Sequence, residues 1–295
     1  MAIPDAQLRQ WASYPGPARS VAAHAKVRGA LEVSLRAAGH SVDIYLQGSY
    51  RNYVNTKADS DVDIVAELTS VCDHDTSSLP PWDAQRFWAN MQYSNYTYDN
   101  FRADVHNALR VSFGNSVVEH SKAIEVKGDW LRMKVDVLPA MRYRQVYAYD
   151  GATSHSFDGI AFWVTGRRAV NWPDQHFENG VAKNQSTNEY FKPAVRMMKN
   201  ARRVAIEHGL LQEGSAPSYF LQGLLWNVPD ECFVADLSTT YCHTLNWLCS
   251  NQQAQTWFKC QNGIDSLFGF GPEQWSTTSA LQVEAALATL WNNWG

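Results

Sequence analysis

The stretch QGSYRNYVNTKADSDVDIVAEL, residues 47–68, decides how the rest of the chain is interpreted. Its second half alternates like a buried strand, yet Asp61 and Asp63 interrupt the apolar residues. Side chains two apart on a strand point to one face, so both carboxylates leave the core while Val62 and Ile64 enter it. Two carboxylates this close repel each other unless a cation lies between them or one takes up a proton. We favour a divalent cation, because Mg²⁺ takes one or two carboxylates and completes its shell with water and phosphate.

A third acidic residue stands in a similar context in LRMKVDVLPAM, residues 131–141. Apolar residues at every second position enter the core there, and Asp136 lies on the opposite face. An acid in such a run is costly if it is buried without a partner. Three aspartates on neighbouring strands can hold two Mg²⁺ ions, with Mn²⁺ as a substitute, for chemistry on a triphosphate. We therefore predict that Asp61, Asp63 and Asp136 are both the metal ligands and the catalytic residues.

Gly48 and Ser49 form a turn after the strand expected over residues 41–47. A glycine followed by a hydroxyl residue lets backbone N–H groups and the serine Oγ approach a phosphate. Such a pair is by itself an ordinary turn. The pair followed by Asp-x-Asp on a strand and by a distant third Asp is far more specific. We predict that Gly48 and Ser49 bind phosphate; the alternative is a calcium-like or merely solvated acidic loop.

The loop after Ser49 carries more polar residues. Asp59 is expected to cap backbone N–H groups or to orient Ser49 rather than to bind metal. The mouth of the active site is expected to be lined by Arg51, Asn52, Asn55 and Lys57.

Patterning divides the chain near residue 165 into a sheet-rich lobe, residues 1–165, and a helical lobe, residues 166–295. In the first lobe we predict a long helix over 17–38, strands over 41–47 and 62–68, an interrupted helix over 82–113, two β-branched runs over 116–128 and 129–141 joined by a hairpin turn at Lys127-Gly128-Asp129, and strands over 144–149 and 159–164. In the second we predict helices over 174–185, 188–209, 218–228 and 279–294. The fold class is α+β.

Composition limits the function. A net charge of −4 and a pI near 6.1 give no basic footprint, so small charged ligands fit better than long nucleic acid. No signal peptide or membrane span is expected, and we predict a cytoplasmic protein. Zinc is an alternative for Cys242-His243, Cys249 and Cys260, but their spacing matches no common finger and favours buried free thiols.

GSYRNYVNTKADSDVDI together with KVDVLPA resembles the polymerase-β-like nucleotidyltransferases. Within them the chain is most similar to the CD-NTases, the bacterial relatives of cyclic GMP-AMP synthase in anti-phage (CBASS-type) signalling, and above all to their clade E. The resemblance covers about residues 40 to 230. It implies a mixed-sheet core lobe and a C-terminal helical lobe, with the active site in the cleft between them.

The resemblance also implies the reaction. Two ribonucleoside triphosphates, including UTP or ATP, would be joined into a cyclic dinucleotide with release of pyrophosphate. A separate effector protein would receive the product, and the enzyme would act as a monomer away from membranes. The residues themselves support nucleotidyl transfer and leave the cyclisation to the resemblance.

Further nucleotide-binding residues follow from the resemblance. Lys199 would reach the triphosphate, Ser218 would donate to it and Tyr219 would stack on a base. The residues agree, since Lys199 is a point charge suited to phosphate and Ser218 follows Pro217 at a helix start. A core aromatic remains the alternative for Tyr219, and a solvated lysine for Lys199.

Asn171 is the candidate for reading a base edge, because an amide both donates and accepts. In clade E relatives an asparagine in this neighbourhood goes with acceptance of a uridine nucleotide. The alternative is a cap before the helix that Pro173 starts.

Three rival functions share parts of this pattern. A template-independent nucleotidyltransferase acting on RNA ends would need a basic surface that the composition does not indicate. A nucleotidyltransferase acting on a small-molecule or protein acceptor would share the three aspartates. A degenerate nucleotide sensor would have no need to keep them.

Overall fold

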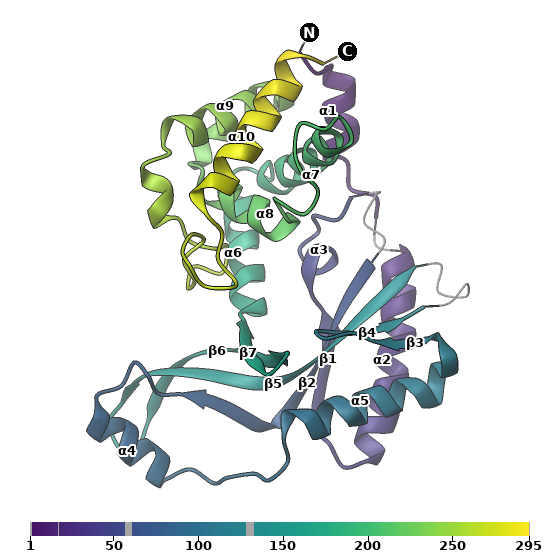
Figure 1. Cartoon of the computed structure of the whole chain (residues 1–295), viewed down its shortest axis with the longest axis vertical. Coiled ribbons are helices and arrows are strands. Elements are labelled where there is room, and N and C mark those ends of the chain that lie inside the picture. Colours follow the sequence, from purple (N-terminus) through teal and green to yellow (C-terminus); the bar gives the residue numbers. More distant parts are fainter. Residues whose placement is uncertain (1, 17, 57–60, 128–132, 295) are drawn as a thin grey trace. The chain divides into compact units, whose positions relative to one another are not determined.

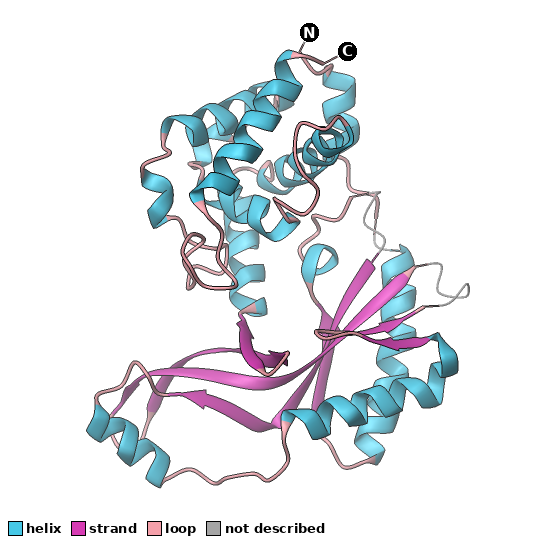
Figure 2. Cartoon of the chain, in the orientation of Figure 1, coloured by secondary structure: helices cyan, strands magenta, loops and turns pink. Residues whose placement is uncertain are grey.

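The computed structural model describes residues 2–16, 18–56, 61–127 and 133–294, and Figures 1 and 2 show the course of the chain. Two compact units make up the chain. The sheet unit comprises residues 17–50 and 60–173, and the helical unit comprises residues 1–16, 51–59 and 174–295. The helical unit thus gathers three separate segments of the sequence. The single division near residue 165 stays a prediction.

Among the described residues, seven strands form one mixed sheet in the order β1-β2-β5-β4-β3, with β6 paired to β5 and β7 paired to β6. β2 and β5 run parallel and the other pairs are antiparallel. β5 pairs with β4 near its start and with β6 further along. The bounds are β1 Val42–Leu46, β2 Asp61–Asp75, β3 Val117–Glu119, β4 Ile124–Val126, β5 Lys134–Tyr149, β6 Ser154–Val164 and β7 Arg167–Asn171.

Two helices, α2 (Ala18–Ala37) and α5 (Tyr98–Phe113), pack on the strands of this sheet (Figure 1). Their apolar side chains share one core with Val62 and Ile64 of β2 and Val135 and Val137 of β5, all fully buried. Because successive strand residues alternate in direction, the residues between these valines and isoleucine point to the opposite face. That face carries the predicted site.

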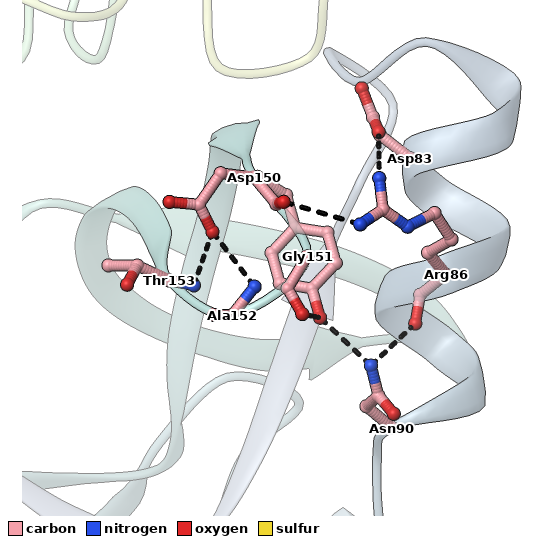
Figure 3. Close-up of polar contacts among 8 residues, drawn as sticks. Asp83, Arg86, Asn90, Asp150, Gly151, Ala152 and Thr153 are labelled. Carbon is pink, nitrogen blue, oxygen red and sulfur yellow. Dashed lines mark hydrogen bonds and ion pairs between the residues drawn. The ribbon is translucent and has the colours of Figure 1, made fainter.

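A second, smaller cluster closes the other end of β2 and β5, where α4 (Pro81–Ala89) packs through Phe87 against Val146. Arg86 donates to the carbonyl oxygen of Asp150 at 3.2 Å, in the turn between β5 and β6 (Figure 3). Gly151 in this turn has a φ of +100°, and a Cβ there would overlap the Arg86 guanidinium. The positive φ favours glycine at this position, whereas the Arg86 side chain could move to admit a Cβ.

The helical unit is built around α7 (Phe191–Glu207), which is buried along most of its length. Arg196 on α7 donates to the carbonyl oxygen of Ala12 at 2.7 Å, and Trp11 packs edge-on against Trp294. These contacts join the first and last segments of the chain. The remaining elements are α1 Asp5–Ala12, α3 Gly48–Arg51, which links the two units in sequence, α6 Pro173–Ser186, α8 Ser218–Asn227, α9 Leu237–Ser250 and α10 Thr277–Asn292. Within the described ranges no helix combines the length and the apolar content needed to cross a bilayer.

The α+β fold with a mixed sheet and a helical C-terminal part is confirmed. Two strand predictions are wrong. The run over 116–128 contains two strands, β3 and β4, because the exposed residues His120, Ser121 and Lys122 turn the chain between them. Residues 144–149 are the end of β5, because pairing with β6 continues through them. Most of the predicted turn at Lys127-Gly128-Asp129 lies outside the described residues.

Candidate active site

Asp61, Asp63 and Asp136 meet at the paired starts of β2 and β5. In the parallel register Asp63 lies opposite Asp136, and Asp61 lies opposite Lys134. β4 extends the arrangement, since Glu125 lies opposite Asp136 on its other side. The structure therefore brings the three predicted aspartates together on one face of neighbouring strands.

A lysine lies among these carboxylates. Lys134 Nζ is 3.3 Å from Asp61 Oδ2, 3.0 Å from Asp136 Oδ2 and 3.2 Å from Glu125 Oε2. Burial alone would lower the pKa of Lys134, but its hydrogen bonds to Asp136 and Glu125 and the neighbouring negative charges raise it above the usual value. The ammonium therefore stays protonated and offsets part of the repulsion between the carboxylates.

Asp63 is desolvated and lies beside another carboxylate. Burial first, and then the charge of Asp136, raises its pKa to about 6, against the opposing charges of Lys122 and Lys134. On the facing strand, Asp136 Oδ1 is buried and has no hydrogen-bond partner among the described residues. Both carboxylates would gain from a further cation, since an unpaired buried acceptor and a desolvated charge are each costly.

Gly48 approaches Asp63 directly. It starts α3 with a φ of +67°, and a Cβ added to it would overlap Asp63 Oδ2 and lie 3.2 Å from Asp63 Cγ. The backbone N–H of Gln47 donates to the carbonyl oxygen of Asp63 at 2.9 Å. Ser49 follows within α3 and is half-buried. The predicted Gly48 therefore adjoins Asp63, and Ser49 is the next residue of the same helix.

Asn171 lies at the end of β7, paired with Ile160 of β6. The next residue, Trp172, is buried and packs edge-on against Tyr143 at 5.5 Å. A Cβ on Gly159 of β6 would lie 2.6 Å from the carbonyl oxygen of Asn171 and 2.7 Å from the Trp172 ring. This close packing fixes the backbone of Asn171, while its side chain is half-buried.

Lys199 belongs to the helical unit and is 4% exposed. Its ammonium donates to the carbonyl oxygen of Val54 at 3.0 Å, and Arg196 donates to that of Tyr53 at 2.6 Å. Lys199 is therefore not a solvated surface lysine, and α7 holds the segment that follows α3.

Ser218 and Tyr219 begin α8, after Pro217 at the N-cap. Tyr219 is 41% exposed, so it is not a core aromatic. Its ring stacks on the ring of His176 with centroids 5.2 Å apart and planes 19° apart. Burial, with the charge of Arg51, lowers the pKa of His176 to about 4, so this imidazole is neutral at physiological pH. One face of Tyr219 is thus backed by a neutral ring.

The other residues predicted near the site belong to the loop after Ser49. Asp59 and Lys57 lie outside the described residues. Asn52 and Asn55 are buried, and Arg51 pairs with Asp174 at 2.5 Å. In the part of the chain that the structure describes, no three His, Cys, Asp or Glu side chains are arranged to hold a metal ion as they stand. Among the described residues, neither the group around Cys242 nor the aspartates, among which Lys134 lies, forms such an arrangement.

Lys134 and Glu125 were missed in the sequence. Lys134 shares the alternation of Asp136, two residues on, and that period of two was the signal that could have identified it. Glu125 gave no such signal, because it became a neighbour of Asp136 only through the pairing of β4 with β5.

Comparison with known proteins gives matches along the sequence of the chain. A family model described as the cGAS/DncV-like nucleotidyltransferase C-terminal helical domain matches residues 178–294. The chain is 39% identical to a cyclic UMP-AMP synthase of Rhodothermus marinus, with 100% of both chains aligned. It is 32% identical to a cyclic dipyrimidine nucleotide synthase CdnE of Legionella pneumophila, over 90% of this chain and 88% of that one.

The fold is similar as well. A solved structure of the Rhodothermus marinus CdnE c-UMP-AMP synthase with Apcpp and Upnpp superimposes with a TM-score of 0.89 at 38% identity. The alignment covers 99% of this chain and 98% of that chain.

Proposed function

Because the chain belongs to the cGAS/DncV-like nucleotidyltransferases, among their CdnE-type cyclic nucleotide synthases, we propose that it joins UTP and ATP into a cyclic uridine–adenosine dinucleotide. Nucleotidyl transfer and cyclic dinucleotide synthesis follow from family membership. The choice of bases, the metal and the biological role are the proposal. The observation that carries it is the full-length relative at 39% identity, together with Asp63 opposite Asp136.

The choice of bases rests on relatives that differ among themselves. One is named as a cyclic UMP-AMP synthase and another as a cyclic dipyrimidine synthase. A uridine nucleotide suits both. Asn171 is proposed to read the base edge, because its amide both donates and accepts and because Gly159 and Trp172 fix its backbone. Asn171→Ala would change the ratio of bases incorporated without unfolding the protein.

The proposed metal is Mg²⁺, with Mn²⁺ as a substitute, held by Asp61, Asp63 and Asp136. The donor set fits, since carboxylate oxygens are the ligands that Mg²⁺ takes. The unpartnered Oδ1 of Asp136 and the raised pKa of Asp63 also fit, because both indicate a deficit of positive charge. When bound, the metal lowers the pKa of an attacking hydroxyl and neutralises charge on the triphosphate.

The chain's own residues would position the reactants. Gly48 and Ser49 would present backbone N–H groups and a hydroxyl to the triphosphate beside Asp63. In the helical unit Lys199 and Ser218 would bind phosphate, and Tyr219 would stack on a base with its ring supported by His176.

The proposed reaction has two rounds. A ribose hydroxyl of one nucleotide releases its proton to solvent and its oxygen bonds to the α-phosphorus of the other, while the bond to pyrophosphate breaks. The linear intermediate then repeats the step within itself, forming the second phosphodiester and releasing a second pyrophosphate. The product would act as a second messenger for a separate effector in CBASS-type anti-phage defence.

The test is an incubation of the protein with the four labelled ribonucleotides and Mg²⁺ or Mn²⁺, followed by phosphatase treatment and mass analysis. We expect a phosphatase-resistant cyclic product containing uridine and adenosine, absent when Asp61→Ala is combined with Asp63→Ala. Nucleotide addition only to an RNA end or to a small-molecule or protein acceptor would replace the proposal with that alternative. A cyclic product of other bases would contradict the substrate assignment alone.

A further inference from the structure

Lys134 is held by the same carboxylate oxygens that the proposed metal would need. It lies two residues before Asp136, on the same face of β5, and directly opposite Asp61 on β2. Its ammonium is 3.0 Å from Asp136 Oδ2 and 3.3 Å from Asp61 Oδ2. The register of the paired strands β2 and β5 places it there.

A third carboxylate binds Lys134 outside the predicted triad. Glu125 Oε2 is 3.2 Å from Lys134 Nζ, and the Glu125 side chain is only 5% exposed. The other oxygen of Glu125, Oε1, is 2.7 Å from Lys127 Nζ. Lys134 therefore divides its contacts between two predicted metal ligands and one acid that is not among them.

A divalent ion and an ammonium cannot both use Asp61 Oδ2 and Asp136 Oδ2. They would compete for the same lone pairs, and like charges at such separations repel strongly. The Lys134 side chain is 33% exposed and ends a flexible four-carbon stem, so it can turn away without a change in the strands. Glu125 would still hold it after it leaves the aspartates.

From this arrangement we propose that Lys134 is a built-in counter-ion that occupies the carboxylate site of the metal-free protein and is exchanged for the metal, with Glu125 retaining the displaced ammonium. Lys134 is a positioning residue. It keeps Asp61 and Asp136 paired and in place until metal arrives, and it lowers the apparent metal affinity by competing for them. This inference rests on the proposed metal site.

The test measures Mn²⁺ binding to the full chain without nucleotide, by calorimetry and by the electron paramagnetic resonance signal of unbound Mn²⁺. Lys134→Met should bind Mn²⁺ about 3- to 10-fold more tightly than the wild type, since exposed ion pairs contribute modestly and each tenfold corresponds to 1.4 kcal/mol. In EDTA the same variant should melt at a lower temperature than the wild type. Lys134→Arg, which keeps the charge, should restore wild-type affinity.

Lys127→Met is the matched control. It removes one positive charge that also pairs with Glu125 but, within the part of the chain that the structure describes, forms no ion pair with Asp61 or Asp136. Its effect on Mn²⁺ affinity should be clearly smaller than that of Lys134→Met. Equal effects of the two variants would mean that the overall charge around the site, and not direct competition by Lys134, sets the Mn²⁺ affinity. That result would overturn the proposed exchange of Lys134 for the metal.

A double-mutant cycle tests Glu125. Glu125→Gln should weaken Mn²⁺ binding in the wild type and do so less when Lys134 is already methionine. Equal weakening in both backgrounds would remove the retaining role of Glu125. If neither the wild type nor Lys134→Met binds Mn²⁺, the inference fails; the proposed function is judged separately by whether the metal-containing assay yields the cyclic product.

Discussion

Asp63 of β2 and Asp136 of β5 lie directly opposite each other in a parallel strand pair, with fully buried valines and an isoleucine on either side of each. The apolar neighbours fix which way the two carboxylates point, because a slip of one residue would bury both acids and expose the core residues. Strand register thus holds two negative charges together against their repulsion.

We expect Asp63→Asn to stabilise the metal-free protein while abolishing synthesis. Because the folded-state pKa of Asp63 is raised to about 6, its contribution to stability is present below about pH 4 and is lost as pH rises through 6. The variant escapes this loss and should gain about 1 to 3 kcal/mol at pH 7.5. Synthesis should be lost, because Asp63 is a proposed ligand of the metal on which the reaction depends.

Chemical denaturation in EDTA at pH 4 and pH 7.5 measures the gain, which should shrink at the lower pH. Asp43→Asn, on the exposed edge of β1, is the control and should leave both stability and synthesis nearly unchanged. A destabilised or active Asp63→Asn protein would refute the assignment of Asp63.

Gly48→Ala should reduce synthesis far more than it reduces stability. The new Cβ would overlap the Asp63 carboxylate, which must move. The control is Gly39→Ala: Gly39 has a similar φ of +87°, but no atom lies within 4 Å of its added Cβ. Both variants should lose about 1 kcal/mol through backbone strain, and only Gly48→Ala should lose activity. Thermal melts and product yield compare them; equal activities would show that Asp63 tolerates the displacement.

His176 should make the protein sensitive to acid. Its folded-state pKa is lowered to about 4, so the unfolded chain binds more protons between about pH 6.5 and 4, and stability is lost as pH falls through this range. His176→Phe, which keeps the stack on Tyr219, should remove about 2 to 3 kcal/mol of that loss. Urea denaturation at pH 4, 5, 6 and 7 checks it, and parallel pH profiles for variant and wild type would contradict it.

Tyr219→Ala should weaken nucleotide binding, whereas Tyr219→Phe should not. Stacking of a base on an aromatic ring contributes about 1 to 3 kcal/mol, so the alanine variant should raise the Kd roughly 10-fold or more. The hydroxyl accepts from Asn262 at 3.3 Å and also hydrogen-bonds Cys260; both partners belong to the protein, so loss of the hydroxyl should leave stacking on the base intact. Binding of a non-hydrolysable triphosphate measured by calorimetry separates the two, and equal affinities of all three proteins would exclude stacking.

The aspartates could be predicted because the period of two is local. Val62 and Ile64 alternate with Asp61 and Asp63 within a few residues, and the face of each follows from that alone. The extension of β2 to Asp75 could not be predicted, because the polar residues after Leu68 suggest a loop. They stay in a strand because β5 continues alongside, pairing Cys72 with Arg142.

The surroundings of the site depend on pairings that no local pattern records. Glu125 and Lys134 meet through two strand registers, β4 with β5 and β2 with β5. Lys199 gave no sign in sequence that its ammonium would bind the carbonyl of Val54, 145 residues earlier. Polar contacts of this kind are set by tertiary packing, which overrides residue preference.

The three-segment build of the helical unit has a consequence for the order in which the protein can form during synthesis. The carbonyl oxygen of Ala12 gains its donor only when Arg196, 184 residues later, has been synthesised. The carbonyl oxygen of Val54 likewise gains its donor only with Lys199. A growing chain therefore carries α1 and the segment after α3 without their partners until α7 has left the ribosome. The helical unit, although it contains residues made first, is completed after the sheet unit, and shortening either end of the chain should damage the same unit.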